Sequence, residues 1–453
     1  MTAAFSRRSL LRASGGLAGA GALSGPLHFL RGRPGLVRHA AIGVGGMGAA
    51  DLEQLSNHGA LEVVALCDVD SANLAAAAAL FPNARTFRDW RELFRNDAAS
   101  FNDAAFNTGS FDSVHVTIPD HMHAPVMLAA LRAGKHVYGQ KPLTRTVAEA
   151  RAVARAARRA GSVTQMGIQN HSNAHYSAAL ELFRAGHIGR VHAVHVWSDR
   201  PAGWWPQGVE RASGADPVPE TLDWNLWLGV APERPYKKDL YHPFSWRGFA
   251  DFGTGAQGDM GCHLMDPALW FLGLEAPLSI RSDGPPPNDE SYPLWSRVRY
   301  EFPPNALTTR GPLPLTWHDG GKAPKQELEE LAAGPVDPNA CLFLGQHGAL
   351  LASPYLPPQL LPAEKFAAVP IPAGTAVNHW HQYVDAVRGK GETSAPFEYA
   401  AFLSEVALLG NVALRFPHET LAWDAKRMRF PARPEADRQL SAPVRAGWEF
   451  GGA

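Results

Sequence analysis

The sequence predicts an α/β protein with a doubly wound parallel sheet in its first domain and an α+β second domain built on a large, mostly antiparallel open sheet. In the first domain, short apolar runs alternate with segments of helical composition, as parallel strands alternate with crossover helices. Beyond residue 167, tryptophans, prolines and short strand-like runs replace that alternation. At 453 residues the chain is too long for one ordinary domain. We therefore divide it into a leader at 1–34 and domains at 35–167 and 168–453.

A glycine-rich turn follows the first apolar run, residues 40–42. Gly43, Gly45 and Gly48 form the pattern G-x-G-x-x-G, which permits a tight turn, backbone approach to a pyrophosphate and close packing of the helix on the strand. The next apolar run ends at Asp68, about 20 residues beyond the glycines, where a carboxylate would hold ribose hydroxyls. A plain strand-to-helix turn is the alternative. The spacing favours a Rossmann domain that binds NAD, with Gly46 and Met47 also in its phosphate loop.

Asp68 also bears on the choice of cofactor. A carboxylate at this position would repel a 2′-phosphate, and residues 69–72 contain no lysine or arginine to receive one. We therefore expect NAD in preference to NADP.

Composition and capping signals predict the remaining elements of the first domain. Pro119 closes a buried strand, and Gly134 follows a helix that has a proline in its first turn. Thr146 and Glu149 form a capping box. In chain order we predict helices at 71–80, 89–94, 125–133 and 146–161, and strands at 61–67, 114–118, 136–138 and 163–166.

In the second domain the predicted elements are fewer. Strand-like runs occur at 191–197, 296–302 and 313–317, and amphipathic helices at 377–388 and 400–415. We expect these two helices to close the chain back against the first domain.

Several polar side chains follow the strands of the first domain, at the edge where a doubly wound sheet binds its ligands. Lys141 comes after a strand and before a proline that fixes the local backbone, so its ammonium group is aimed; a solvated surface lysine is the alternative. The candidates for cofactor contacts at this edge are Pro119, His121, His123, Gln140 and Lys141.

Asp259 and His263 are four residues apart and so lie on one face of a predicted helix, with Asp266 three residues further on. A metal half-site is one alternative, although no second ligand cluster has matching spacing, and we predict no metal. A capping aspartate with a core histidine is the other.

Taken together, these motifs resemble the Gfo/Idh/MocA family of NAD(P)-dependent sugar oxidoreductases, from about residue 37 to about residue 430. The resemblance rests on the glycine fingerprint, Pro119-Asp120-His121-Met122-His123, Lys141-Pro142 and the Asp259–His263 pair. It implies that Lys141, Asp259 and His263 form the active site. Gln140 departs from the family, which has glutamate at this position, so contacts to the nicotinamide ribose are expected to differ.

The resemblance implies a mechanism that agrees with the chemistry of these residues. His263, titrating near neutrality, would take a proton from a sugar hydroxyl while hydride leaves for the nicotinamide. Asp259 would orient it, and Lys141 would stabilise the developing alkoxide. Eight residues are candidates for binding a carbohydrate: His171, Asn173, Arg200, Trp204, Trp205, His242, Trp246 and Arg247. The alternative for each is a structural role in the aromatic core or in anchoring a loop.

Charge and cysteine content limit the partners. The formal net charge of −1 provides no basic field for nucleic acid or an anionic membrane, and three scattered cysteines indicate neither a disulfide framework nor a cysteine zinc site. No run approaches the length of a membrane span. We expect a small carbohydrate substrate and a homo-oligomer formed through the second-domain sheet.

The leader, with Arg7-Arg8 before a stretch of small residues, resembles a twin-arginine export signal; a basic leader without a targeting role is the alternative. It predicts a periplasmic or secreted protein that is exported folded. Because that compartment has no free nicotinamide pool, a tightly held cofactor must be regenerated in place. The competing functions are therefore a sugar or glycoside oxidoreductase, an NAD-dependent glycoside hydrolase that returns its hydride, and a non-catalytic sugar-binding protein.

Overall fold

Two β-sheets organise the computed structural model, which describes residues 35–95, 111–332 and 334–450. The first sheet has six strands in the order β3-β2-β1-β4-β5-β6, all parallel. The second has eight strands and is antiparallel except between β7 and β10. This confirms the predicted fold class. The predicted leader at 1–34 lies outside the described residues.

The first sheet reverses its strand order next to β1, and the glycine turn follows that strand. Its strands are β1 Val37–Ile42, β2 Leu61–Cys67, β3 Arg85–Phe87, β4 Ser113–Val116, β5 His136–Gln140 and β6 Thr164–Gly167. Its helices are α1 Met47–Ser56, α2 Ser71–Leu80, α4 His123–Arg132 and α5 Val147–Ala160. The crossover between β1 and β4 is where such sheets bind dinucleotides.

Local signals explain where these helices begin and end. The capping box of Thr146 and Glu149 opens α5, and Gly161 ends it at a φ of 61°, a left-handed conformation that glycine adopts readily. Helix α4 begins at His123, two residues earlier than predicted, because a 3₁₀ turn, η1 Asp120–Met122, leads directly into it. The motif after β4 is therefore itself helical.

The second sheet has strands near all three predicted runs. Its strands are β7 Val191–Trp197, β8 Ser279–Asp283, β9 Arg297–Phe302, β10 Leu313–His318, β11 Ala340–Gly345, β12 Gly348–Ala352, β13 Gln359–Leu361 and β14 Thr420–Ala422. The helices of this half are α6 Ala174–Arg184, α7 Trp224–Leu228, α8 Gly255–Leu264, α9 Asp266–Leu272, α10 Lys325–Glu330, α11 His379–Val387, α12 Phe397–Leu414 and α13 Pro434–Asp437. In β9, exposed Arg297 and Arg299 alternate with buried Val298 and Tyr300, so one face of the strand is polar.

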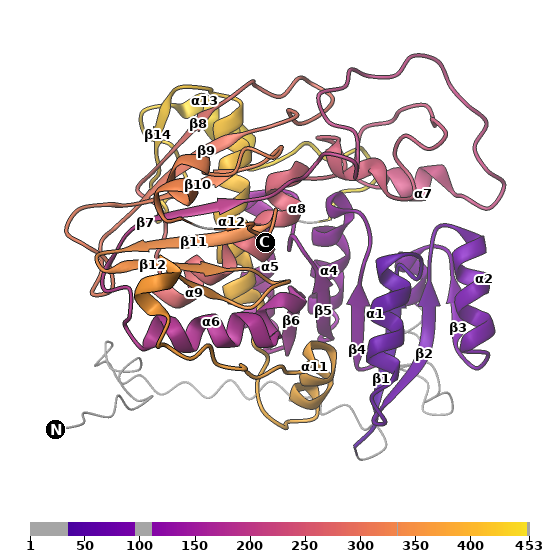
Figure 1. The fold of residues 1–453 in the computed structure, drawn as a ribbon. Helices are drawn as coiled ribbons and strands as arrows, with labels where there is room; N and C mark the ends of the chain where they lie inside the picture. Colours follow the sequence, from indigo (N-terminus) through magenta and orange to yellow (C-terminus); the bar gives the residue numbers. More distant parts are fainter. Residues whose placement is uncertain (1–34, 96–110, 333, 451–453) are drawn as a thin grey trace, which may run out of the picture.

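Helix α12 joins the two halves, as predicted for the C-terminal helices (Figure 1). It packs on α5 and β6 of the first half and on α8 and β8 of the second. Arg151 of α5 donates two hydrogen bonds of 2.6 Å to the carboxylate of Glu405 on α12. Among the described residues α12 is the one helix long and apolar enough to cross a membrane, and it is 83% buried inside the fold.

The segment between β7 and α8 crosses from the second half to the first, which the sequence did not predict. Figure 1 shows α7 above the end of β2. Ser71 donates its N–H to the carbonyl of Thr221, and Asp223 donates its N–H to the carbonyl of Val69. This segment therefore lies against the loop that follows Asp68.

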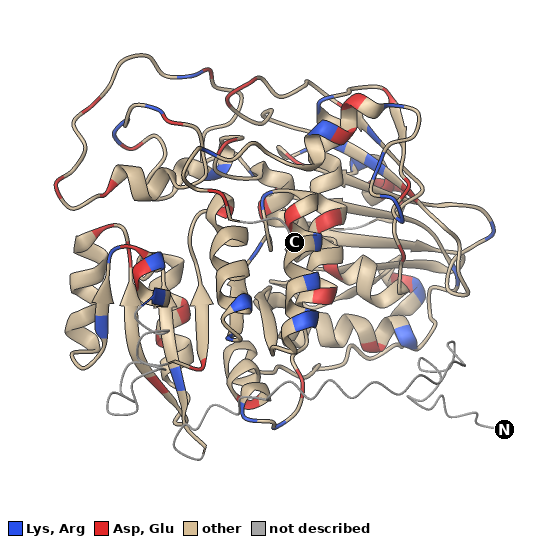
Figure 2. Ribbon diagram, turned by 180° about the vertical axis from the view of Figure 1, so that it is seen from behind, with Lys and Arg blue, Asp and Glu red and all other residues tan. Residues whose placement is uncertain are grey.

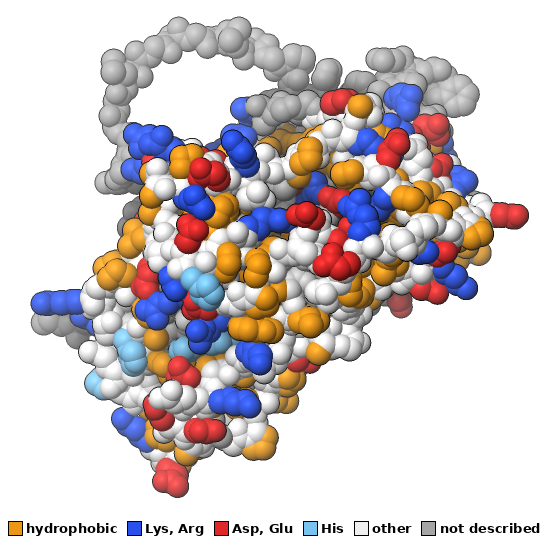
Figure 3. All heavy atoms as spheres, turned by 90° about the horizontal axis from the view of Figure 1, so that it is seen from above, with side chains coloured by type: hydrophobic (Ala, Val, Ile, Leu, Met, Phe, Trp, Pro, Cys, Tyr) orange, Lys and Arg blue, Asp and Glu red, His pale blue; other side chains and the backbone are white. Residues whose placement is uncertain are grey.

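Charged residues lie mainly on the loops and outer helices, while the strands are largely uncharged (Figure 2). On the face shown in Figure 3, basic and acidic side chains are interspersed. This distribution agrees with the formal net charge of −1.

Candidate active site

The glycine turn has the close contacts that the fingerprint requires. Gly43 has a φ of 83°, and a Cβ on Gly48 would lie 2.1 Å from the carbonyl oxygen of Gly43. The third glycine is therefore needed for packing of α1 on β1. Gly46, at a φ of 51°, has open space where a Cβ would be.

Helix α1 and Asp68 complete a surface suited to a dinucleotide. No side chain caps the N-terminus of α1. The N–H of Gly48 bonds to the carbonyl of Gly45, whereas the N–H groups of Met47 and Ala49 have no partner among the described residues and are available to an anion. The carboxylate of Asp68 accepts hydrogen bonds of 2.9 Å from the N–H of Val44 and the N–H of Asp70. It is thereby fixed at the end of β2, next to the glycine turn, and the residues present fit NAD.

Gln140, the residue that departs from the family, faces a buried carboxylate. Its Nε2 donates a 2.9 Å hydrogen bond to Asp51 of α1, which also accepts from the hydroxyl of Thr117 and the indole N–H of Trp380. Burial raises the pKa of Asp51 to about 6, although each of these three hydrogen bonds acts to lower it. A glutamate at 140 would set two carboxylates against each other, so glutamine matches Asp51.

Lys141 lies where the two halves meet. Its ammonium donates to Oδ1 of Asp259 at 2.9 Å and to the main-chain carbonyl of Asp259 at 3.0 Å. Arg247 donates from Nε to the same Oδ1 at 3.2 Å. Burial alone would raise the pKa of Asp259, but the charges of Lys141 and Arg247 outweigh it and lower the pKa to about 2. Asp259 is therefore an anion held by two cations.

His263 lies one turn further along α8 and is half-buried. Burial, followed by the charge of Lys141, lowers its pKa to about 3, while Asp259 opposes this shift. The expectation that His263 titrates near neutrality is therefore wrong: its ring is neutral at pH 7. Its Nδ1 is a buried nitrogen with no hydrogen-bond partner among the described residues. A substrate hydroxyl therefore cannot reach Nδ1; Nε2, which is not buried and makes no hydrogen bond among the described residues, is the nitrogen that can accept its proton.

Asp120, from the motif after β4, was not among the predicted site residues. Its carboxylate accepts a 2.7 Å hydrogen bond from the hydroxyl of Thr254, the residue before α8. Burial raises its pKa to about 7; this hydrogen bond opposes the shift, and the negative charge of Asp259 adds to it. The signal in the sequence was an aspartate in the motif at a strand's end.

The two predicted histidines of that motif pack against main chain. His121 has its ring nitrogens 3.3 and 3.1 Å from the carbonyls of Phe252 and Trp227, and His123 has its nitrogens 2.9 and 2.7 Å from those of Pro142 and Ile118. Both rings are buried. They have no nitrogen free for the predicted cofactor contact; instead they join segments around the site.

Asp266 and His171 form a separate buried pair. Nδ1 of His171 lies 2.8 Å from Oδ2 of Asp266, whose Oδ1 accepts the hydroxyl of Tyr399. The His171 ring also stacks on Trp270 with centroids 4.0 Å apart. The side-chain partners of Asp266 are therefore His171 and Tyr399, and Lys141 pairs with Asp259 instead. Within the described parts of the chain, no three histidine, cysteine, aspartate or glutamate residues are placed to hold a metal ion.

Of the predicted carbohydrate contacts, Arg247 and Arg200 interact with the charged centre, and Trp204 packs against Arg200. Arg200 acts electrostatically on His263 and stacks on the half-exposed Trp204, 3.7 Å from its ring centroid. Arg247 contacts Asp259 directly. Tyr355, which is 52% exposed, was missed by the sequence analysis although the charges of Arg200 and Asp259 act on it.

The other candidates have structural partners. Asn173 caps α6 and donates to the carbonyl of Pro354, and His242 lies 3.3 Å from the carboxylate of Asp70, beside the cofactor edge. Trp205 and Trp246 are buried, and each donates its indole N–H to a nearby oxygen.

The fold and the glycine turn define an NAD-binding Rossmann domain joined to an α/β domain that completes its active-site edge. One family model, described as "Oxidoreductase family, NAD-binding Rossmann fold", matches residues 37–168. A second, "Oxidoreductase family, C-terminal alpha/beta domain", matches residues 199–306. The chain belongs to the Gfo/Idh/MocA family of oxidoreductases, which confirms the resemblance seen in its motifs.

Curated relatives match part of the chain. Inositol 2-dehydrogenase of Salmonella typhimurium is 29% identical over 157 residues, which are 34% of this chain and 43% of that protein. Inositol 2-dehydrogenase of Arthrobacter sp. is 31% identical over 162 residues, 35% of this chain and 44% of the relative. The chain spans less than half the length of these relatives.

Solved structures share the fold over most of the chain. WlbA dehydrogenase from Bordetella pertussis, solved with NADH and UDP-GlcNAcA, has a TM-score of 0.59 at 15% identity and covers 86% of this chain and 99% of its own. Levoglucosan dehydrogenase, solved with NADH and L-sorbose, has a TM-score of 0.57 at 17% identity, with coverages of 85% and 98%.

Proposed function

We propose that this protein is an NAD-dependent oxidoreductase that removes a hydride from a hydroxyl-bearing carbon of a sugar or glycoside. The observation that carries the proposal is the contact of Lys141 with Asp259, one helical turn from the neutral ring of His263. A cation and a neutral base are thus held together at the cofactor edge. The inositol dehydrogenase relatives and the sugar-bound neighbours support a carbohydrate substrate.

Each residue has a defined task in this proposal. His263, neutral because its pKa is lowered to about 3, accepts the hydroxyl proton at Nε2, the nitrogen that is not buried. Lys141 stabilises the oxygen as negative charge develops on it. Asp259 holds the lysine and balances the imidazolium that forms, and Arg247 holds Asp259 in turn. When bound, NAD supplies the hydride acceptor.

A single-turnover experiment tests this function. The enzyme loaded with NAD is mixed with a panel of sugars and glycosides, and absorbance of the reduced nicotinamide is followed. Reduction with formation of a keto-sugar supports the oxidoreductase. Release of free sugar and aglycone without net reduction would establish the glycoside hydrolase instead, and binding without either reaction would establish a sugar-binding protein.

We also propose export of the folded protein to the periplasm or beyond by the twin-arginine route. Arg7 and Arg8, followed by small residues, support this proposal. Changing both arginines to lysine should leave precursor in the cytoplasm. Unchanged export of that variant would contradict the assignment.

Association of identical subunits through the second sheet is a further part of the proposal. It is supported by the regular outer face of β9, where Arg297 and Arg299 are exposed. Sedimentation of the intact protein should give a mass above that of one chain, and Arg299→Glu should lower it. A monomer at all concentrations would overturn this association.

A further inference from the structure

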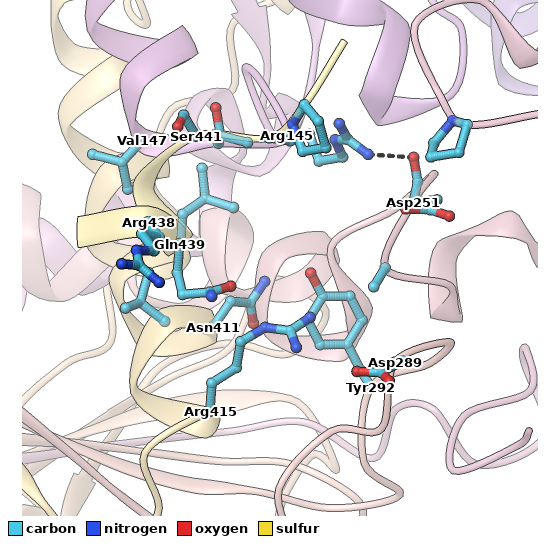
Figure 4. Close-up of a pocket in the computed structure, with 17 residues that line it drawn as sticks. Arg145, Val147, Asp251, Asp289, Tyr292, Asn411, Arg415, Arg438, Gln439 and Ser441 are labelled. Carbon is cyan, nitrogen blue, oxygen red and sulfur yellow. Dashed lines mark hydrogen bonds between the residues drawn. The ribbon is translucent and has the colours of Figure 1, made fainter. Parts of the chain in front are cut away.

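A cavity of about 280 Å³ lies between α5, α12 and the C-terminal segment. Figure 4 shows side chains from these elements facing it, together with residues of the loops at 250–251 and 289–292. None of the residues predicted to bind cofactor or substrate lines it. The cavity is therefore separate from the candidate active site and has polar side chains of its own.

Three arginines give this cavity an excess of positive charge. Among the described residues, no ion pair or hydrogen bond reaches the guanidinium of Arg415 or that of Arg438. Arg145 donates one Nη1 hydrogen bond to the carbonyl of Asp251, but its Nε is buried without a partner. Arginine side chains left in this state favour an anionic ligand, because guanidinium groups bind carboxylate and phosphate with paired N–H donors.

The acidic residues of the cavity do not cancel this charge. The carboxylate of Asp251 is already paired with Arg234, which lies outside the lining. Asp289 is exposed at the edge. The unpaired charge facing the interior is therefore that of the arginines.

The side chain of Asn411 gives the cavity an acceptor that needs a hydrogen-bond donor from a ligand. It is only 8% exposed, and its Nδ2 donates a 2.8 Å hydrogen bond to the carbonyl of Thr254, which fixes the orientation of the amide. Its Oδ1 is consequently left as a buried acceptor without a partner. Figure 4 shows Asn411 among Gln439, Arg415 and Tyr292. A ligand hydroxyl would satisfy this oxygen, whereas a simple anion would not.

We propose that this cavity binds a small hydroxylated anion, a sugar acid or a sugar phosphate, with its acidic group on Arg415 and Arg438 and a hydroxyl on Asn411. The volume exceeds that of a few waters and is compatible with one such molecule. Sugar acids and sugar phosphates have in common one acidic group and several hydroxyls.

The position of the cavity connects it to the catalytic elements. Arg145 is four residues beyond Lys141 in the same loop, and Asn411 holds the carbonyl of Thr254, the residue before the helix that carries Asp259. A ligand in the cavity would therefore contact the loop that carries Lys141 and the side chain that holds the start of the helix carrying Asp259.

Isothermal titration of the full chain, saturated with NAD, tests the proposal. The probes are D-gluconate and D-glucose 6-phosphate, with D-sorbitol as the neutral control. At least one anion should bind, and sorbitol should bind more weakly. Arg415→Gln should weaken the anion at least about tenfold, the worth of one charge-assisted hydrogen bond. Arg438→Gln, at an exposed position, should weaken it less, and Arg310→Gln, exposed and outside the cavity, should leave it unchanged.

The outcomes separate this site from the catalytic one. Binding that survives Arg415→Gln and Arg438→Gln but disappears in Lys141→Ala would put the anion in the active site and overturn the proposal. Failure of both anions to bind would overturn it too. Preference for one anion identifies the acidic group as carboxylate or phosphate. Because heat of binding is measured, the result does not depend on the proposed enzymatic activity.

Discussion

The ammonium group of Lys141 donates hydrogen bonds to both the carboxylate and the main-chain carbonyl of Asp259, at 2.9 and 3.0 Å. Lys141 follows β5 of the parallel sheet, and Asp259 lies on α8 of the second half. A single side chain thus joins the cofactor edge to the helix that carries the proposed base. Any substrate oxygen that approaches Lys141 must also approach α8.

Replacement of Lys141 or His263 should abolish hydride transfer and spare cofactor binding. Lys141→Ala and His263→Ala should each slow single-turnover reduction of bound NAD by at least about 100-fold, because one removes the charge on the reacting oxygen and the other removes the base. NAD should stay bound, since Asp68 and the glycine turn are on other elements. Lys238→Ala, at an exposed lysine, is the control. A His263→Ala enzyme that reduces its cofactor at the wild-type rate would refute the site.

Asp120 should make stability depend on pH. Its folded pKa of about 7 lies above the ordinary 3.8, so the folded state keeps a proton that the unfolded state has lost. Its contribution is therefore full below about pH 4 and is lost as the pH rises through 7, by up to about 4 kcal/mol. Asp120→Asn cannot ionise and should lose less stability between pH 5 and 8 in urea unfolding. The exposed Asp239→Asn should follow wild type; equal pH dependence in all three proteins would contradict this assignment.

Asp68 should determine both affinity and choice of cofactor. Asp68→Ala removes the acceptor for the N–H groups of Val44 and Asp70, and the ribose contact, so NAD affinity should fall by about tenfold or more. The preference for NAD over NADP should also shrink, because the repulsion of a 2′-phosphate is gone. Fluorescence titration with both cofactors measures this. Wild-type protein that binds NADP more tightly than NAD would show that Asp68 does not select the cofactor.

Gly48 should tolerate no side chain. A Cβ there would lie 2.1 Å from the carbonyl oxygen of Gly43, which is backbone and cannot rotate away. Gly48→Ala should reduce the free energy of unfolding by about 1–3 kcal/mol and weaken NAD binding, since α1 must shift from β1. Gly59→Ala, where a Cβ meets open space, should change neither. Chemical denaturation of both variants decides the point.

The sequence was informative wherever a local rule applied. The glycine spacing, the Thr146–Glu149 capping box and the alanine-rich run at 71–80 predicted elements that the structure contains, because each depends on nearby residues. The i, i+4 spacing likewise placed Asp259 and His263 on one helix.

Properties that depend on distant residues were not predictable. The low pKa of His263 results from burial and from Lys141, which is more than a hundred residues away. The position of the Asp120 carboxylate depends on its hydrogen bond with Thr254. The position of Gln140 depends on the carboxylate of Asp51, which also accepts a hydrogen bond from Trp380. No pattern in the sequence links these positions, because tertiary packing alone brings them together.

The attachment of α12 to the first half has a consequence for synthesis of the chain. Met166 donates its N–H to the carbonyl of Ala395, and Phe397 donates its N–H to the hydroxyl of Thr164, so β6 and α5 gain their outer cover from residues translated much later than they are. A nascent chain that has emerged only as far as Gly167 would present these apolar surfaces bare. The cover of β6 and α5 is therefore complete only after Leu414 has left the ribosome.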